Sequence, residues 1–247
     1  MHMNEIGNRS RPILLFLHGG GVSSWMWEAQ VSHFADDYLC IVPDLPGHGE
    51  SREQRFSIRS CADELLAYLE KQHGDKDVTV IGFSLGSQVA LQMVAQNSRR
   101  ISRVMLNSAS VHPLPMMQKV ITPMMYASYP LVKWRTFSKL QAKMLHIGEV
   151  QFERYFADAK QTTAETLSQV MRENLSFAFP EKAQDAQLLK GFITIGAKEN
   201  RLIKKSAKTL SARFPQFESL IVADVGHGLP LAKPLLFNQA LEKLLNH

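Results

Sequence analysis

Cysteine and long apolar runs are both scarce in this sequence. Its 247 residues include only Cys40 and Cys61, so neither a disulfide framework nor a four-cysteine metal site is expected, and a reducing compartment is favoured. No stretch reaches the length needed to cross a bilayer, and residues 1–11 lack the apolar core of a signal peptide. These absences predict a cytoplasmic protein without a membrane partner.

A strong charge bias is also missing. The chain has 28 basic and 23 acidic residues, a formal net charge of +5, and its basic residues are dispersed. The densest pairs, Arg99-Arg100 and Lys204-Lys205, have no interleaved aromatic residues and are interpreted as solvated helix surface. The composition therefore predicts no nucleic-acid partner.

Short β-rich runs alternate with longer helical patterns along most of the chain. Alternation of strand and crossover helix is typical of an α/β fold, a doubly wound and mostly parallel sheet with helices on both faces. The predicted strands cover residues 13–18, 38–43, 78–82, 104–107, 192–196 and 219–223. The predicted helices cover residues 24–35, 57–73, 85–95, 202–213 and 234–246.

Residues 111–185 interrupt this alternation, because they contain helix-length apolar patterns, several prolines and no convincing strand. We predict a helical cap there, inserted into a core domain made of residues 1–110 and 186–247. The cap is rich in methionine and aromatic residues, which adapt to apolar ligands. An alternative is that most of these side chains simply pack the cap against the sheet.

The sequence Gly82-Phe83-Ser84-Leu85-Gly86 stands between a predicted strand and a predicted helix. A serine at such a sharp turn is held in a strained conformation with its hydroxyl exposed, and flanking glycines avoid collisions with the neighbouring elements. This context predicts that Ser84 is a nucleophile. The alternative is a glycine-flanked turn whose serine only caps the helix.

A second motif, residues 18–21 with the sequence His-Gly-Gly-Gly, ends the first predicted strand. Glycine lets a backbone N–H approach a substrate carbonyl, so we predict that the Gly20 and Leu85 N–H groups form an oxyanion hole. His18 is expected to anchor the loop through its ring nitrogens. Alone, three glycines could equally form a flexible turn.

The third motif, Gly226-His227-Gly228, follows the last predicted strand. A histidine there can reach a nucleophile at the carboxyl edge of the sheet and exchange its proton. Glu199, three residues after the penultimate strand, is predicted to orient the imidazole. Two alternatives stay open: Glu199 only favours a helix N-terminus, or Asp224 supplies the acid.

Serine, acid and histidine in this order resemble the cap-bearing α/β-hydrolases, a group that includes carboxylesterases, lipases and carbon–carbon bond hydrolases. Residues 44–51, Asp-Leu-Pro-Gly-His-Gly-Glu-Ser, are similar to that family's Asp-x-x-Gly-x-Gly-x-Ser loop, which Asp44 and Ser51 are expected to brace. The family commonly has Asp where Glu199 stands. It also begins with two antiparallel strands, of which at least one must be absent or stunted here, so the resemblance implies six or seven strands.

The resemblance implies a serine hydrolase that cleaves carboxylic esters of small to medium apolar substrates through an acyl-enzyme. No metal or organic cofactor is expected, and the expected partner is a small ester-like substrate bound by a monomer or homodimer. Alternatives on the same triad are a carbon–carbon bond hydrolase, an amidase, a lactonase or a perhydrolase. A signalling receptor that keeps the pocket to bind or slowly cleave a ligand is a further alternative.

Overall fold

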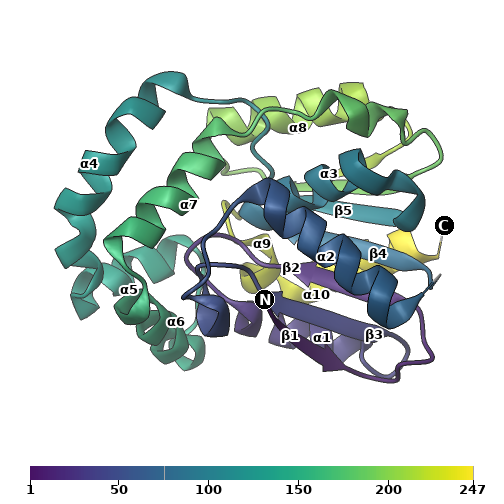
Figure 1. The fold of residues 1–247 in the computed structure, drawn as a ribbon, viewed down its shortest axis with the longest axis horizontal. Helices are drawn as coiled ribbons and strands as arrows, with labels where there is room; N and C mark the ends of the chain where they lie inside the picture. The colour runs from purple at the N-terminus through teal and green to yellow at the C-terminus, as the bar shows by residue number, and fades with distance from the viewer. Residues whose placement is uncertain (75, 247) are drawn as a thin grey trace.

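A seven-stranded sheet forms the centre of the molecule (Figure 1). The computed structural model describes residues 1–74 and 76–246. The strand order is β1-β3-β2-β4-β5-β6-β7, and every neighbouring pair except β1–β3 is parallel. This confirms the predicted mostly parallel α/β sheet. The strands are β1 His2–Ile6, β2 Ile13–Leu17, β3 Leu39–Asp44, β4 Val78–Phe83, β5 Arg103–Asn107, β6 Lys190–Gly196 and β7 Glu218–Val222.

The edge strand β1 was not among the strands predicted from the pattern. It pairs antiparallel with β3, with Ile6 opposite Cys40 and His2 opposite Asp44. Its sequence is mostly polar, because an edge strand is partly solvated and carries little hydrophobic signal. One antiparallel strand is thus present among the described residues, in agreement with the shortened sheet that the resemblance implied.

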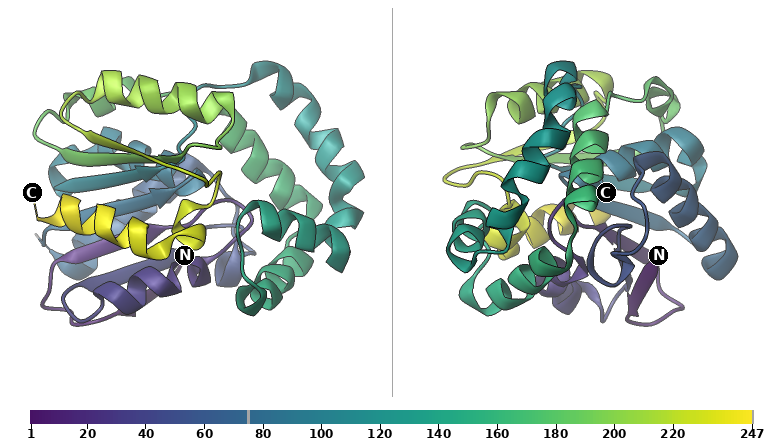
Figure 2. Two further views of the ribbon diagram at one scale, coloured as in Figure 1. Left: turned by 180° about the vertical axis from the view of Figure 1, so that it is seen from behind. Right: turned by 60° about the vertical axis from the view of Figure 1, so that its left-hand side comes forward.

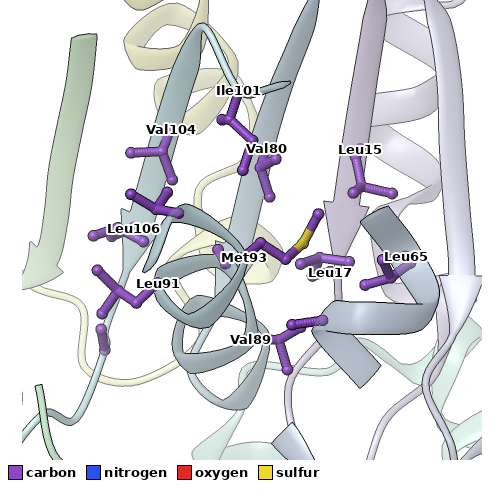
Figure 3. Packing of buried hydrophobic residues seen from close by; sticks show 14 of the residues in the cluster. Leu15, Leu17, Leu65, Val80, Val89, Leu91, Met93, Ile101, Val104 and Leu106 are labelled. Carbon is purple, nitrogen blue, oxygen red and sulfur yellow. The ribbon is translucent and has the colours of Figure 1, made fainter. Parts of the chain in front are cut away.

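The central strand β2 shows why both faces of the sheet need helices. All five of its residues are buried, and they alternate between two hydrophobic clusters: Leu15 and Leu17 face one side, Leu14 and Phe16 the other. Figure 3 shows the first cluster, where Leu15 and Leu17 lie with Leu65 and Val89.

Helices cover these two faces. Buried residues of α2 and α3 belong to one hydrophobic cluster, and those of α1 and α10 belong to the other. The core helices are α1 Glu28–Phe34, α2 Ile58–His73, α3 Leu85–Asn97, α8 Arg201–Arg213, α9 Leu229–Ala232 and α10 Pro234–Leu245. Short 3-10 helices are η1 Ser24–Trp27, η2 Gly49–Ser51, η3 Ser98–Arg100 and η4 Glu181–Asp185.

Four helices between β5 and β6 lie at one end of the sheet, and we call them the cap helices (Figures 1 and 2). They are α4 Pro115–Val132, α5 Arg135–Met144, α6 Glu149–Gln161 and α7 Ala164–Ser176. Pro123 and Pro130 lie inside α4 rather than ending it. Proline has no backbone N–H to donate within a helix, and both prolines lie at exposed positions. Helices α4 and α7 lie side by side, with Ser168 Oγ 3.0 Å from Thr122 Oγ1.

Candidate active site

Ser84 occupies a strained turn between β4 and α3. Its φ is +51°, a left-handed conformation that costs free energy for any residue with a side chain. The flanking glycines make this turn possible, since a Cβ at Gly82 would lie 2.6 Å from the Gly86 carbonyl oxygen. A Cβ at Gly86 would lie 2.1 Å from the Leu17 oxygen. The close approach of strand and helix explains the Gly-x-Ser-x-Gly spacing.

His227 lies between Ser84 and Glu199. Its Nε2 is 2.9 Å from Ser84 Oγ, and its Nδ1 is 2.9 Å from Glu199 Oε1. The Glu199 side chain is 2% exposed, whereas that of His227 is 31% exposed. A buried carboxylate can hold the imidazole with Nε2 toward the serine, while the open side of the ring faces a cavity.

The loops that carry Glu199 and His227 are fixed against each other. The Lys198 N–H donates to the Val225 carbonyl over 2.8 Å, and the Ala197 N–H donates to that of Val222. A Cβ at Gly196 would lie 2.3 Å from the Val225 oxygen, so glycine is needed where the two loops meet. The turn after β6 therefore places Glu199 opposite His227.

Asp224, the alternative acid, points elsewhere. Its side chain is 80% exposed, and its carboxylate lies 3.6 Å from Lys198 Nζ. The backbone at Asp224 has a φ of +62°, which serves the turn after β7. The geometry brings Glu199, and not Asp224, to the imidazole.

His18 anchors the glycine loop, as its position predicted. The Leu45 N–H donates to Nε2 over 2.9 Å, and Nδ1 lies 2.8 Å from the Gly19 carbonyl oxygen. Burial, together with the nearby His48 ring, lowers the pKa of His18 to about 3. The ring therefore stays neutral, with its proton on Nδ1, and acts as a structural acceptor.

The loop of residues 44–51 is braced by Asp44 and Ser51. Asp44 accepts the N–H groups of Ser24 and Glu50, and Ser51 Oγ accepts the N–H of His2. Burial raises the pKa of the Asp44 carboxyl, but these backbone hydrogen bonds outweigh it, and the net pKa is lowered. Asp44 is thus held as a carboxylate for a structural purpose.

A cavity of about 440 Å³ lies in front of Ser84, and we call it chamber A. Gly20 and Leu85 line it beside Ser84, so the predicted oxyanion-hole residues share one cavity with the predicted nucleophile. The rest of its wall comes from the glycine loop, the 44–51 loop, and the cap helices with the turn between α6 and α7: Gly21, Gly47, His48, Met125, Ser128, Val132, Phe137, Gln141, Thr162, Thr166, Leu167, Val170, Met171 and Asn174.

A second cavity of about 350 Å³, chamber B, also borders Ser84. It is lined by His227 and by Ser110, His112, Leu114, Met144, Leu145, Asn174, Leu175, Asn200, Leu202 and Ile203. Among the described residues that line the two chambers, none is Asp, Glu, Lys or Arg. The chambers meet at Ser84 and Asn174, and their walls favour uncharged groups.

Three polar residues near Ser84 were not predicted as parts of the site. The Asn107 carbonyl accepts the Ser84 N–H over 2.8 Å, and the Asn107 amide donates to Thr194 on β6. Gln88 is fully buried and exchanges hydrogen bonds with Asn174 on α7. In the sequence Gln88 looks like any helical residue, and nothing there indicates that Asn174 meets it.

No group of three or more His, Cys, Asp or Glu side chains in the described part of the chain could hold a metal ion. The polar atoms that converge on Ser84 instead form a linear chain, carboxylate to imidazole to hydroxyl. Such a chain activates a hydroxyl for attack on an electrophilic carbon.

The parallel sheet, the strained serine turn and the serine–histidine–carboxylate geometry together define a hydrolase-type scaffold. Comparison with known proteins agrees: the family described as alpha/beta hydrolase fold matches residues 12–178. The chain belongs to this family.

Individual similarities are more distant. The chain is 35% identical over 105 residues to an uncharacterized protein of Mycobacterium tuberculosis, covering 40% of this chain and 30% of that protein. It is 28% identical over 147 residues to a pimeloyl-[acyl-carrier protein] methyl ester esterase of Aromatoleum aromaticum, covering 54% and 57% of the two chains. These matches span less than two thirds of either relative.

Among solved structures, MenH from S. aureus superposes with a TM-score of 0.81 at 19% sequence identity, covering 99% of this chain and 98% of that chain. At this identity the likeness establishes the fold alone.

Proposed function

We propose that this chain is a serine esterase that hydrolyses carboxylic esters with small to medium apolar acyl groups. The observation that carries the proposal is the uninterrupted contact from Glu199 through His227 to Ser84, with both distances at 2.9 Å. The family assignment and the esterase named among the relatives support it.

The proposed reaction has two steps. His227 Nε2 takes the Ser84 proton as Oγ attacks the ester carbonyl, and the N–H groups of Gly20 and Leu85 stabilise the oxyanion. The imidazolium then gives its proton to the departing alkoxide, which leaves as an alcohol. Water, deprotonated by His227, attacks the acyl-enzyme, and collapse of the second intermediate returns the proton to Ser84 and releases the acid.

The two chambers suggest how the ester lies across Ser84. The leaving oxygen must receive its proton from His227, which lines chamber B. The carbonyl oxygen must face Gly20 and Leu85, which line chamber A. We therefore assign the acyl chain to chamber A and the alcohol to chamber B, with the uncharged walls favouring apolar groups on both sides.

The alternatives predict other behaviour. An amidase, lactonase, perhydrolase or carbon–carbon bond hydrolase on the same residues would prefer its own substrate class over simple esters. A receptor would be labelled once or turn over slowly, and it would need a ligand-dependent partner. The absence of lysine and arginine among the described chamber walls also disfavours a polyanionic substrate.

The test compares the wild type with Ser84→Ala, using fluorophosphonate labelling and a panel of p-nitrophenyl esters of increasing acyl length. We expect labelling and many turnovers in the wild type, and loss of both in Ser84→Ala. The matched control is Ser108→Ala, which alters a neighbouring buried serine. Equal labelling of wild type and Ser84→Ala would remove Ser84 from the mechanism, and a flat rate profile across acyl lengths would contradict the assignment of chamber A.

A further inference from the structure

Large hydrophobic side chains are concentrated on the outside of the cap helices. Of the fourteen that are exposed among the described residues, nine lie between residues 116 and 150. Met116 is 84% exposed, Met144 70% and Trp134 62%. One interpretation of the sequence was that most methionine and aromatic side chains of this region pack the cap against the sheet. These three belong to the remainder that do not.

Helix α4 has two apolar faces. One face looks inward: Ile121 is buried, and Met125 and Val132 line chamber A. The other carries Met116, Val120 and Met124 at four-residue spacing, which places them on one side of the helix. Figure 2 shows α4 as the outermost helix at this end of the molecule. Its outer face is therefore apolar and uncovered within the described chain.

All charged residues of α4, of α5 and of the turn that joins them are basic, whereas Glu149 and Glu153 of α6 lie in one hollow with Lys139 and Lys143. Residues 111–148 contain five Lys and Arg residues and no Asp or Glu. Arg135 pairs with Glu153 of α6, and Lys133 Nζ contacts backbone carbonyl oxygens. Three further lysines are exposed at the surface: Lys119 on α4, and Lys139 and Lys143 on α5.

This combination selects an anionic occupant. In a two-fold pairing of α4 with a second copy, each chain would bring the same basic residues and no carboxylate from this segment, so like charges would meet. An acidic protein surface would match the lysines, but it would leave the exposed Met116, Val120 and Met124 without an apolar partner. An anionic lipid surface satisfies both features: its interior accepts the apolar side chains and its headgroups the lysines.

We propose that the outer faces of α4 and α5 form a docking surface for an anionic lipid bilayer. The docking surface is defined by Met116, Lys119, Val120, Met124, Leu140 and Lys143. The sequence predicted no membrane partner because it has no bilayer-spanning run, and no helix of the described residues is long and apolar enough to cross a membrane. A helix that lies in the interface needs no such length.

Docking would place the active site next to its substrates, a consequence that rests on the proposed esterase function. The inner face of α4 forms part of the wall of chamber A, so a bilayer on the outer face is separated from that chamber by one helix. An apolar ester dissolved in the bilayer would then be concentrated beside the acyl chamber.

The experiment is co-sedimentation of the whole chain with vesicles, with the double variant Val120→Glu/Met124→Glu as the test. Vesicles of pure phosphatidylcholine are compared with vesicles containing phosphatidylglycerol. We expect binding to the anionic vesicles, weakened at least about tenfold by the double variant and by about 0.5 M salt. A charge reversal, Lys119→Glu, is expected to weaken binding in the same direction.

Two controls separate docking from unfolding and from general charge effects. Leu188→Glu changes a side chain that is 98% exposed far from α4, and Lys204→Glu reverses an exposed charge on α8. Both should bind vesicles as the wild type does. All variants should hydrolyse a short-chain ester at the wild-type rate, and vesicle binding can be measured even if no esterase activity exists.

Two outcomes would overturn the proposal. The first is no binding to anionic vesicles, and the second is equal binding by the wild type and the double variant. After the first outcome, a dimer in light scattering that the double variant dissociates would assign the surface to a second copy. Binding to polyglutamate that Lys119→Glu abolishes would assign it to an acidic protein.

Discussion

The Nδ1 atom of His227 lies 2.9 Å from Oε1 of Glu199, 28 residues earlier in the chain. The imidazole is thereby held with Nε2 toward Ser84, and the carboxylate is almost wholly excluded from solvent. This pairing of a half-exposed histidine with a buried glutamate is the feature from which the proposed chemistry follows.

Removing the charge of Glu199 is expected to slow ester hydrolysis sharply. In Glu199→Gln the amide can present its NH₂ to Nδ1 and favour the wrong tautomer, so kcat should fall on the order of 10³ to 10⁴-fold. The matched control is Asp224→Asn, which should keep kcat within about twofold, since Asp224 is exposed and contacts Lys198. Steady-state kinetics on a p-nitrophenyl ester checks both. A larger fall in kcat for Asp224→Asn than for Glu199→Gln would show that Glu199 is not the acid that orients His227.

The two chambers can be narrowed separately with matched substitutions. Leu167→Trp reduces chamber A and Leu202→Trp reduces chamber B, and both leucines are half-buried. We expect Leu167→Trp to lower kcat/KM for long acyl chains by about tenfold while sparing long alcohols. Leu202→Trp should have the opposite selectivity. The measurement is kcat/KM over two ester series, one varied in the acid and one in the alcohol. The same selectivity for both variants would contradict the orientation of the ester.

The serine turn should not tolerate a methyl group at Gly86. A Cβ there would lie 2.1 Å from the Leu17 carbonyl oxygen and 2.7 Å from that of His18, and both of these residues are buried. Gly86→Ala is expected to cost about 3 kcal/mol or more of unfolding free energy, or to prevent folding. The control is Gly148→Ala, where a Cβ meets open space and the change should stay within about 0.5 kcal/mol. Urea denaturation measures both, and equal stability of the two variants would contradict the close approach.

Asp158 gives a pH-dependent contribution to stability. It lies on α6 and accepts hydrogen bonds from Ser23 Oγ and Trp25 Nε1, both at 2.8 Å. Burial raises the pKa of its carboxyl above the ordinary 3.8, despite these bonds. The folded state therefore holds the proton more tightly than the unfolded state, and stability falls as the pH rises from the unfolded pKa through the raised one.

Asp158→Asn keeps an acceptor for both donors and removes the buried charge. We expect it to match or exceed the wild-type melting temperature at pH 7 and to lose the fall with pH that begins near 3.8. Asp158→Ala, which loses the acceptor, should be destabilised by about 1 to 3 kcal/mol. Thermal unfolding between about pH 4 and pH 7 checks the pair. A lower melting temperature for Asp158→Asn at pH 7 would show that the charge itself is favourable.

The sequence by itself determined six of the seven described strands and the order of the site residues along the chain. Five-residue buried strands leave continuous apolar runs, and the glycines around Ser84 are required by contacts under 3 Å, so both features are visible as local patterns. The polar edge strand His2–Ile6 was not predicted, because it is a strand through its pairing with β3 and not through its own composition.

Only the tertiary structure decided which carboxylate meets His227, how Gln88 joins Asn174, and where the apolar side of α4 faces. The first two are contacts between segments that lie far apart in the chain. The third is the absence of such a contact among the described residues. The hydrophobic period of a helix predicts that it has an apolar face, but only the arrangement of its neighbours tells whether that face is covered.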